Sequence, residues 1–476
     1  MTVPRERSIP TIFVITLLAA ICRLAALGQP MRFDEAVSWA YYVGRPWATI
    51  VGTYQQPNNH VLYSLLAKLC AEGVNYAPWA LRLPALVAGI AVVPLTWQVG
   101  RRFADDTSAL FAAALSVGAT QLVLYSTNAR GYTIVVAVFL ALLLIADDLR
   151  THATVWRWVA FAVLAAAGLY AIPVMLYPLG VVCLWLLLAS RLTAPAQRTP
   201  FQVSLVAAVV ASALIAGILY LPIIQSAGLR ALTGNKFVAP SSWAQFVDEL
   251  PRMVGSTLAS WTSPLPLWCI PVMAVLALLG IRRPTNSGRP SLALAVALWC
   301  GALLVATHRA PFVRIWLFLL PLFFIATARG ALRVARRFTT REIPHVSLVA
   351  IGLGVASLAV AVFTHAAEQS DDTGAFRPAE QVTALLAPRL HRGDRVLAPI
   401  PAIGPLLYYF PRAGADTTLL TVSLDVSNRA FLVLDAHQGQ TLAWAIANHI
   451  IDPAVFAEPT LLAKYPDGEL WETSRR

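Results

Sequence analysis

TIFVITLLAAICRLAAL, residues 11–27, is followed shortly afterwards by RFDE, residues 32–35, and this stretch decides the fold class of the chain. The apolar run, together with its flanks, is long enough to cross most of the ~30 Å hydrocarbon core of a bilayer. Directly beyond it, where the chain should leave the membrane, stand the adjacent carboxylates Asp34 and Glu35. Ionisable groups at such a boundary inside a helix bundle are usually functional. The stretch therefore indicates a membrane protein with acid–base chemistry at a membrane face.

The composition is typical of a protein that crosses the membrane many times. Hydrophobic residues make up 58% of the chain and charged residues 13%, and the mean hydropathy is +0.66. Soluble domains are closer to about a quarter charged, so a large globular protein is excluded. The net charge of +12 comes almost wholly from arginine, since the only lysines are Lys68, Lys236 and Lys464.

The arginines cluster in short loops between apolar segments, which is the orientation signal of cytoplasmic loops. In a soluble chain such an excess could indicate nucleic acid, but no acidic tail, low-complexity tract or arginine–aromatic array accompanies it. We therefore expect the lipid bilayer, and no nucleic acid, as a partner. Arg5 and Arg7 place the N-terminus in the cytoplasm, so the first span exits and the acid pair faces outward. The predicted location is the plasma or inner membrane, crossed several times.

Alternation of basic clusters and bare loops predicts eleven spans. Residues 35–50 and 60–72 are too short and too polar to cross, and we expect helices at the interface there. Prolines at 173, 178, 222 and 271 could mark broken spans. The predicted spans are 11–27, 79–99, 107–125, 131–147, 155–171, 173–190, 202–223, 265–281, 290–307, 311–329 and 345–365.

Within the spans, a few side chains call for an interpretation of their own. Arg23, one turn from the end of the first span, is predicted to snorkel to the headgroups, and Arg82 to be structural. The five cysteines, at 22, 70, 183, 269 and 300, lie in or beside apolar segments and form no disulfide framework or C-x-x-C metal site. We expect them to be buried small apolar side chains. The first segment lacks a small-residue cleavage site and is predicted to be a retained span.

Residues 1–365 are predicted to form the transmembrane domain, and residues 366–476 a small extracytoplasmic α/β domain. After residue 365 the long apolar runs stop. Short strand-like stretches at 395–397 and 430–434 alternate with helical ones at 378–386 and 441–449. The transmembrane domain carries two large outer loops. One, 29–77, holds the acid pair, and the other, 224–264, is predicted to form an interfacial helix and a lid.

Asp34 and Glu35 are the candidate catalytic residues. A carboxylate can take the proton from an attacking hydroxyl, and partial desolvation at a membrane face raises its proton affinity. Asp34 is the better candidate for this base, with Glu35 as its support. The alternative is structural, because acids in the first turn of a helix over 35–50 would complement its dipole. Position alone leaves both open.

The segment QQPNNHVLY, residues 55–63, is the second candidate. The amides of Asn58 and Asn59, the imidazole of His60 and the phenol of Tyr63 can hydrogen-bond sugar hydroxyls. The alternative is a polar cap on the interfacial helix, with Asn59 as its N-cap.

A third candidate, YSTNARGY at 125–132, forms a polar kink between two spans. Arg130, with Asn128 and Tyr132 beside it, suits phosphate recognition. The alternative is an interfacial arginine that reaches lipid headgroups.

The fourth candidate is HRAPFVR at 308–314. Arg309 and Arg314 could clamp a lipid-linked phosphate and neutralise a leaving group. Positive charge on the outer side runs against the usual bias, which makes these arginines informative. Lys236 in the lid loop is a weaker phosphate candidate.

The order of these motifs resembles the GT-C glycosyltransferases. An acid pair beyond the first span, an Asn/His-containing L-Y-x-L-L helix, A-L-R-L-P-A and A-R-x-Y carry the resemblance, with P-F-V-R-I-W-L-F-L-L-P and a C-terminal domain opening F-R-P-A-E-Q-V. More narrowly, the chain is similar to bacterial relatives of protein O-mannosyltransferases and aminoarabinose transferases, the dolichyl-phosphate-mannose-protein mannosyltransferase-like group.

The resemblance implies inverting transfer of a sugar from a polyprenyl-phosphate donor to an acceptor hydroxyl on the outer face, the acceptor being a glycan, lipid or protein. By similarity Asp34 maps to the first-loop catalytic aspartate and Glu35 to its partner. Arg130 and the late-loop arginine map to positions near the lipid phosphate. The chain has Asn128 where many relatives have Glu, and N-N-H-V-L-Y where H-P-P-L-Y is commoner.

Three questions stay open at this point. The acid pair could help to bind a divalent cation, although no further acidic ligands are evident in the outer loops. A transporter or flippase of lipid-linked sugar is an alternative, but it predicts charges at the membrane midplane, whereas these gather at the outer ends. A non-catalytic membrane scaffold is the second alternative.

Overall fold

The computed structural model describes residues 5–56, 58–192, 194–233, 240–281, 288–338, 345–423 and 428–476. The chain divides into two compact units. The first comprises Met1–Leu27, Val51–Cys70 and Arg82–Gln369, and the second comprises Gly28–Ile50, Ala71–Leu81 and Ser370–Arg476. The acid-bearing segment 28–50 therefore belongs with the C-terminal sheet rather than with the helical unit.

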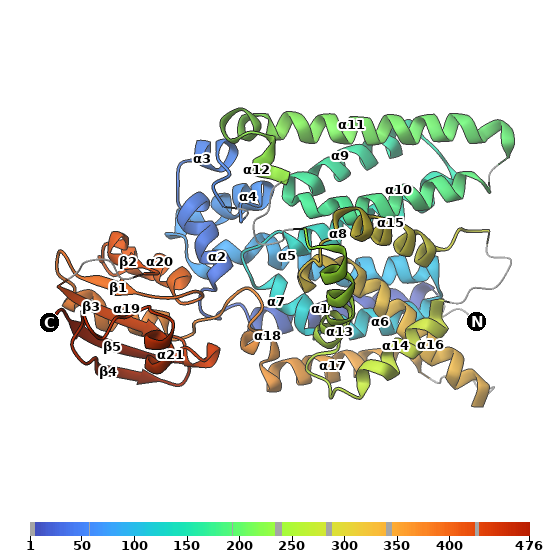
Figure 1. The fold of residues 1–476 in the computed structure, drawn as a ribbon. Coiled ribbons are helices and arrows are strands. Elements are labelled where there is room, and N and C mark those ends of the chain that lie inside the picture. Colours follow the sequence, from blue (N-terminus) through green and yellow to red (C-terminus); the bar gives the residue numbers. More distant parts are fainter. Residues whose placement is uncertain are drawn as a thin grey trace. The chain divides into compact units, whose positions relative to one another are not determined.

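The first unit is made of helices (Figure 1). Its elements are α1 (Arg5–Ala25), α4 (Val61–Ala71), α5 (Pro78–Phe103), α6 (Asp106–Leu115), α7 (Thr120–Ser126), α8 (Tyr132–Thr151), α9 (Val155–Ala171), η3 (Pro173–Met175), α10 (Leu176–Ser190), α11 (Pro195–Ala227), α12 (Leu229–Thr233), α13 (Trp243–Thr262), α14 (Cys269–Ile281), α15 (Leu292–Thr307), η4 (Val313–Leu319), α16 (Leu320–Phe338), α17 (Val346–Thr364) and α18 (Ala366–Gln369).

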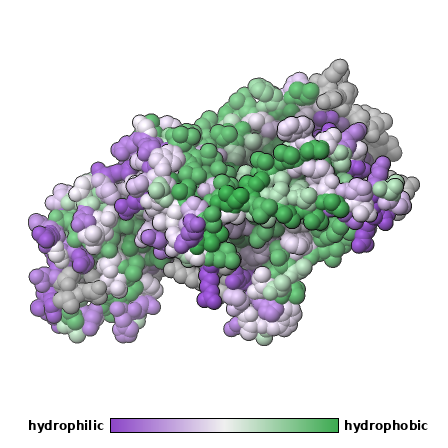
Figure 2. Space-filling model, turned by 90° about the horizontal axis from the view of Figure 1, so that it is seen from above, coloured by the Kyte–Doolittle hydropathy of each residue, from purple (hydrophilic) through white to green (hydrophobic). Residues whose placement is uncertain are grey.

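The prediction of a multi-pass membrane protein is confirmed by the length and apolar character of these helices. Among the described residues, seven helical segments are long and apolar enough to cross a bilayer, and α6 with α7 forms an eighth, bent one. Three shorter apolar helices, α9, α14 and α15, fall on the remaining predicted spans. Apolar side chains gather over this unit on the face shown in Figure 2, as expected where a helix meets lipid on its outer side.

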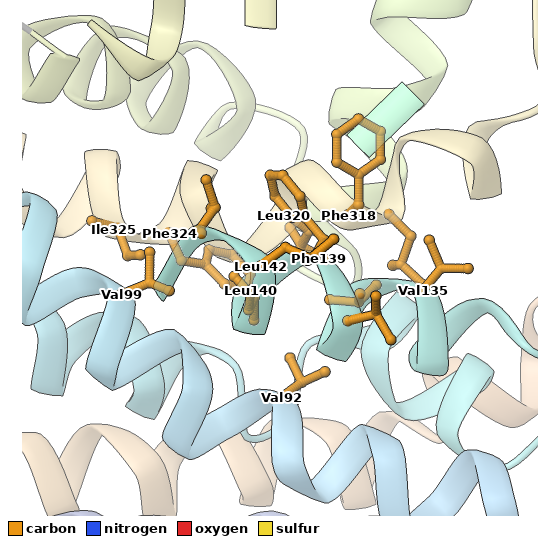
Figure 3. Close-up of a cluster of buried hydrophobic side chains, with 14 of the residues drawn as sticks. Val92, Val99, Val135, Phe139, Leu140, Leu142, Phe318, Leu320, Phe324 and Ile325 are labelled. Atoms are coloured by element: carbon orange, nitrogen blue, oxygen red, sulfur yellow. The ribbon is translucent and has the colours of Figure 1, made fainter. Parts of the chain in front are cut away.

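The centre of the helical unit is a layer of large side chains from α5, α8, η4 and α16 (Figure 3). Phe139 of α8 meets Phe318 of η4 edge to face, with ring centroids 5.1 Å apart. Elsewhere the helices approach backbone to backbone: a Cβ on Gly330 of α16 would collide with the Leu276 carbonyl of α14. Close contact through small residues is the usual way for helices to associate in lipid, where apolar burial gives little driving force.

The span predicted over 107–125 is broken. α6 and α7 meet at 64°, and the break contains no proline. Its freed backbone groups find partners on two neighbouring helices. The carbonyls of Ser116 and Val117 accept from the Arg23 guanidinium at 3.3 and 2.9 Å, and the Gly118 N–H donates to Ser357 Oγ at 2.9 Å. Non-helical backbone at membrane depth needs such internal partners.

The prediction that Arg23 snorkels is therefore wrong. Its side chain is fully buried, and Nε donates to Ser126 Oγ at 3.1 Å. The break supplies carbonyls inside the protein, so the guanidinium has no need to reach the surface. Arg82 is structural as predicted, since it donates to the Leu27 carbonyl at 2.7 Å. All five cysteines are free, but Cys70 is exposed, contrary to expectation.

The prolines expected to break spans do not do so. Pro173 opens η3 at the beginning of a span, and Pro178, Pro222 and Pro271 lie within α10, α11 and α14. α11 runs on to Ala227, so the predicted lid loop begins with helix. About half of that loop is the amphipathic α13. This helix packs against α7, η4 and α14 and buries Phe246 and Trp261, while Trp243 stays exposed.

The second unit is built on a five-stranded sheet with the order β2-β1-β3-β5-β4. β1 pairs in parallel with β2 and β3, and β5 pairs antiparallel with β3 and β4. The elements of this unit are α2 (Phe33–Ser38), η1 (Trp39–Val43), α3 (Trp47–Gly52), η2 (Glu72–Val74), α19 (Ala379–Leu386), η5 (Ala387–Arg389), β1 (Arg395–Leu397), α20 (Ile403–Arg412), η6 (Thr417–Leu419), β2 (Leu420–Thr421), β3 (Arg429–Leu434), η7 (Ala436–Gln438), α21 (Leu442–Ala447), β4 (Thr460–Tyr465) and β5 (Gly468–Ser474).

The predicted strands at 395–397 and 430–434 are β1 and β3, and the predicted helices are α19 and α21. The sequence of β3 is a continuous apolar run because other elements pack against both faces of the strand. Phe431 and Val433 lie in one hydrophobic cluster with α19 and α20, and Leu432 and Leu434 lie in another with α21. The hairpin β4–β5 was not predicted, although Pro466-Asp467-Gly468 is a recognisable turn sequence.

One buried acid stands at the carboxyl end of β3. Asp435 Oδ1 accepts hydrogen bonds from the backbone N–H groups of His437 and Gln438 at 3.1 and 3.3 Å. Oδ2 is buried and has no hydrogen-bond partner within the described ranges. Burial raises the pKa of Asp435 to about 6, against the pull of the two backbone N–H groups.

We predict that replacing Arg23 by methionine destabilises the protein strongly. The substitution leaves the Ser116 and Val117 carbonyls buried without their donor, and each such loss costs about 1–3 kcal/mol. The free energy of unfolding in detergent, followed by tryptophan fluorescence, should fall by about 2–5 kcal/mol. Arg392→Met, in an exposed turn of the second unit, is the control. Unchanged stability of Arg23→Met would contradict the bridging role.

We predict that Asp435 makes the second unit less stable as the pH rises. The folded-state pKa lies above the unfolded value, so its stabilising contribution is complete below pH about 4 and is lost by pH about 6 to 7, amounting to about 3 kcal/mol. Asp435→Asn cannot titrate. The difference in melting temperature, variant minus wild type, should therefore rise between pH 4 and pH 7. A difference that stays constant over this range would refute the assignment.

Candidate functional site

The acid pair lies in the first turn of α2, in the second unit. The Glu35 carboxylate reaches back and accepts the Arg32 backbone N–H at 2.9 Å, which caps the helix. Ser38 Oγ donates to the Asp34 carbonyl at 2.9 Å. Glu35 is 1% exposed and Asp34 is 8% exposed. Glu35 therefore has a structural task, and the structural alternative considered from the sequence applies to Glu35.

A π-helical turn follows the acid pair. η1, residues Trp39–Val43, continues directly from α2, and the Trp39 ring meets Tyr408 of α20 edge to face at 5.0 Å. The guanidinium of Arg412 lies over the Tyr408 ring at 3.9 Å. π-Helical turns are rare and frequently stand at functional sites. The interfacial helix predicted over 35–50 is therefore three short elements, α2, η1 and α3.

In the first unit a polar cluster joins three distant segments. His60, just before α4, accepts the Gly131 N–H at Nδ1, 3.1 Å away. Its ring lies edge-on to Tyr132 at 5.3 Å. The Tyr132 hydroxyl accepts from Arg314 Nε at 3.1 Å. Arg130 completes the cluster, with its guanidinium 5.9 Å from the Tyr132 ring centre. We call these five residues the His60 cluster.

The charge state of His60 follows from its surroundings. Burial, and then the positive charges of Arg130 and Arg314, hold the pKa of His60 well below its usual value. The ring is therefore neutral at pH 7. Because Nδ1 accepts a hydrogen bond, its proton lies on Nε2, and the cluster offers one imidazole N–H and two guanidinium groups. Such a donor set fits an anionic ligand.

The other residues expected around this cluster have local roles as well. Asn59 donates to the Thr53 carbonyl at 3.0 Å and accepts from Ser64 Oγ at 3.1 Å. Its side chain ties the loop together, and α4 begins at Val61, so Asn59 is not the first residue before the helix. Asn58 provides the carbonyl that accepts from Arg130 at 3.4 Å. Tyr63 is buried beside Gly131.

Asn128 and Arg309 are placed differently. Asn128 is buried, and its backbone carbonyl accepts the Arg130 N–H at 2.7 Å, which shapes the turn. Arg309 lies in the loop before η4 and acts electrostatically on the Tyr177 hydroxyl rather than on His60. Its Nε–H group is buried and has no hydrogen-bond partner in the part of the chain that the structure describes. Lys236 lies outside the described residues.

Two contributors to these sites, Gly131 and Tyr125, were not among the predicted residues. Gly131 provides the N–H that fixes the His60 ring, and a Cβ there would press on Ile172 and Tyr63. Tyr125 packs edge-on against Tyr132 at 4.9 Å. Both stand in the motif 125–132, from which only Asn128, Arg130 and Tyr132 had been chosen as candidates. Across the described ranges, no three His, Cys, Asp or Glu side chains converge as metal ligands.

Comparison with solved structures shows which fold this is. ArnT from Cupriavidus metallidurans in the apo state matches 97% of this chain and 97% of its own, with a TM-score of 0.61 and 11% identity. ArnT bound to undecaprenyl phosphate gives 0.57 and 12% over the same shares. The archaeal oligosaccharyltransferase AglB from Archaeoglobus fulgidus, in complex with an inhibitory peptide and a dolichol-phosphate, matches 97% of this chain and 74% of its own, at 0.52 and 10%.

ArnT and AglB are GT-C-fold membrane glycosyltransferases, and this chain has the GT-C fold. The resemblance noted in the sequence motifs is thereby confirmed at the level of the fold. No protein-family description matches the sequence, and no curated protein is significantly similar to it.

We predict that Arg314→Gln raises the pKa of His60 toward its usual value. The substitution removes one of the two positive charges that oppose protonation of the ring. Nitrogen NMR of protein labelled in histidine should show that wild-type His60 takes up its proton well below the pH usual for histidine, and that the variant takes it up at a higher pH than the wild type. Arg309→Gln, which removes a charge that does not act on His60, is the control. Titration of wild-type His60 near pH 6.5 would contradict the arrangement.

Proposed function

We propose that the protein is an inverting glycosyltransferase that moves a sugar from a polyprenyl phosphate to an acceptor hydroxyl on the outer face of the plasma membrane. The observation that carries the proposal is the His60 cluster, a set of hydrogen-bond donors that suits an anion, in a chain with the GT-C fold. ArnT has been solved with undecaprenyl phosphate and AglB with a dolichol-phosphate. A polyprenyl-phosphate donor agrees with both the donor set and the fold.

In this proposal the phosphate of the donor lies against Arg130 and Arg314. Arginine forks match phosphate oxygens and compensate the charge that develops as the sugar departs. The His60 Nε2–H adds a neutral donor, so the ring orients oxygen atoms without taking up a proton. Arg309, with a buried N–H group that lacks an acceptor among the described residues, is a further contact for the lipid phosphate. Lys236 in the lid segment remains a weaker candidate.

Asp34 is proposed as the base. As the acceptor oxygen attacks the anomeric carbon, the bond from that carbon to the phosphate oxygen breaks. The polyprenyl phosphate leaves with the bonding electrons, and the hydroxyl proton passes to Asp34. Attack opposite to the leaving phosphate inverts the anomeric centre. Glu35 supports the base through the helix cap, since its carboxylate already accepts the Arg32 N–H.

The amphipathic helix α13 is proposed to cover the phosphate side of the site. It packs on α7, whose last residues begin the motif 125–132, and on η4, which carries Arg314. Its start is tied to the loop of Arg309, because the Ser241 N–H donates to the His308 carbonyl at 2.8 Å. The Trp243 ring also meets the His308 ring at 4.9 Å. Excluding water there matters, because hydrolysis competes with transfer.

The test is transfer of radiolabelled sugar from defined polyprenyl-phosphate donors by the full chain in nanodiscs. Glycan, lipid and protein acceptors are offered in separate reactions, with and without a chelator. Loss of transfer with chelator would assign the acid pair to a divalent cation. Movement of lipid-linked sugar between leaflets without transfer would replace the proposal by a flippase.

We predict that Asp34→Asn lowers kcat by about 100-fold or more, since a positioned base contributes on the order of 10²–10⁴. Glu35→Gln is the matched control in the same turn. Glutamine can close the same cap, because its amide oxygen also accepts the Arg32 N–H, so this variant should retain most activity. Equal loss in both variants would contradict the division of roles, and normal transfer by Asp34→Asn would support a scaffold.

A further inference from the structure

The second unit contains the kind of place where open α/β sheets bind ligands. β1 and β3 are parallel neighbours. After β1 the chain passes through α20 to β2 on one side, and after β3 it passes through α21 to β4 on the other. The carboxyl ends of two such strands usually flank a binding crevice. The loops in question are 398–402 after β1 and 435–441 after β3.

In this chain a side chain, that of Gln440, connects the two loops. The Gln440 side chain accepts the Asp435 N–H at 3.2 Å and donates to the Ile400 carbonyl at 2.8 Å. Beside the loop after β1, the side chain of Phe33 packs against two glycines. A Cβ on Gly404, the second residue of α20, would stand 2.5 Å from Phe33 Cδ2 and 2.8 Å from Phe33 Cα. A Cβ on Gly374 would meet Phe33 and Pro401 at 2.8 and 3.0 Å.

The backbone around Phe33 is held as tightly as its ring. The Phe33 N–H donates to the Gly374 carbonyl at 2.8 Å, and the Asp34 N–H donates to the Thr373 carbonyl at 3.2 Å. The Arg32 guanidinium, which is buried, donates to the carbonyls of Ser370 and Asp372 at 2.7 and 3.1 Å. The turn 370–374 thus binds three consecutive residues that lead into the acid pair.

The turn 370–374 is itself fixed to the loop after β3. The Asp371 carboxylate pairs with His437 Nε2 at 3.1 Å, and His437 belongs to η7, which the Asp435 side chain caps. A connected set of contacts therefore runs from the end of β3 through the turn 370–374 to Phe33. Its last member is the residue before Asp34.

α2 needs such support. It has six residues, and isolated helices shorter than about 12 residues are marginal in water. Its position follows from the elements that it touches, and α20 is the main one. Any shift of α20 or of the turn 370–374 moves the Asp34 carboxyl with it.

We propose that the C-terminal α/β unit acts as a positioning domain for the catalytic base. Its positioning residues are Phe33, which packs beside the loop after β1, and Arg32, which bonds to the turn 370–374. This inference rests on the proposed function, because it assigns the unit its part in glycosyl transfer. Phe33 and Arg32 do not touch the reacting atoms. They hold α2 so that Asp34 meets the acceptor hydroxyl.

The test is Gly404→Ala in the full chain. The added Cβ has no room beside Phe33, so α2 is displaced. A displacement of about 1 Å at a reacting group can cost on the order of 100-fold in rate. We expect kcat to fall by that order, with the KM for the lipid donor unchanged because the His60 cluster is untouched. Hydrogen exchange of the Phe33 and Asp34 amides should accelerate in the same variant.

Two sets of variants serve as controls. Gly352→Ala, also inside a helix but with nothing within 4 Å of the added Cβ, should leave both kcat and amide exchange unchanged. Phe33→Ala should reproduce the loss of kcat without overpacking, and Phe33→Leu, which keeps most of the packing, should restore it. This pair keeps the test valid if Gly404→Ala does not fold.

The outcomes separate this proposal from the proposed function. Wild-type transfer with an unchanged kcat in Gly404→Ala and Phe33→Ala, despite faster exchange of the two amides, would overturn the positioning role alone. Absence of transfer by the wild type from every donor would overturn the proposed function and this role together. A rise in the KM for the lipid donor at constant kcat would also overturn the positioning role.

Discussion

A backbone amide inside hydrocarbon must find its partner within the protein, and the helical unit meets this constraint at the bend between α6 and α7 by burying an arginine. Arg23 is fully buried, and the acceptors of its hydrogen bonds are three backbone carbonyls and the Ser126 hydroxyl. The bend directs α7 toward the turn that ends in Arg130. The geometry of the His60 cluster therefore depends on the hydrogen bonds of Arg23 at the bend between α6 and α7. The sequence of that span shows no feature that marks the bend.

Within the His60 cluster, the position of the His60 ring determines its charge state. Two arginines stand beside one imidazole, and their charge together with burial keeps that imidazole from becoming a third cation. A neutral ring still donates one hydrogen bond, so the site keeps a directional contact while it limits its total charge.

The sequence predicted the elements well where local chemistry decides them. Apolar runs bounded by arginines gave the spans, and the covered apolar strand β3 was recognisable by itself. The bend at 116–119 was not predicted, because its cause is Arg23 on another helix and not a proline within the span. The candidate residues were chosen by type, and contacts such as the one between His60 and the Gly131 N–H join residues that are 71 positions apart in the sequence. Lys236 stays a prediction.

The acid pair shows the same division between local and distant causes. Its place in the first turn of a helix was among the interpretations weighed from the sequence, and the cap by Glu35 fits that pattern. Its inclusion in a unit with residues 370–476 could not be derived from the sequence near residue 34, because the contacts that place it there are made by residues more than 300 positions further along the chain.

That inclusion has a consequence for biosynthesis. The Arg32 side chain bonds to a carbonyl 338 residues further along the chain. At the usual speed of translation, about 5–20 residues per second, the segment around Asp34 emerges tens of seconds before the turn that holds it. During that interval the later spans are still being made, and α2 lacks the turn 370–374 that holds it. The order of synthesis thus delays the final placement of α2 until the second unit has been completed, so a chain on a ribosome that stalls early carries the acid pair without its support.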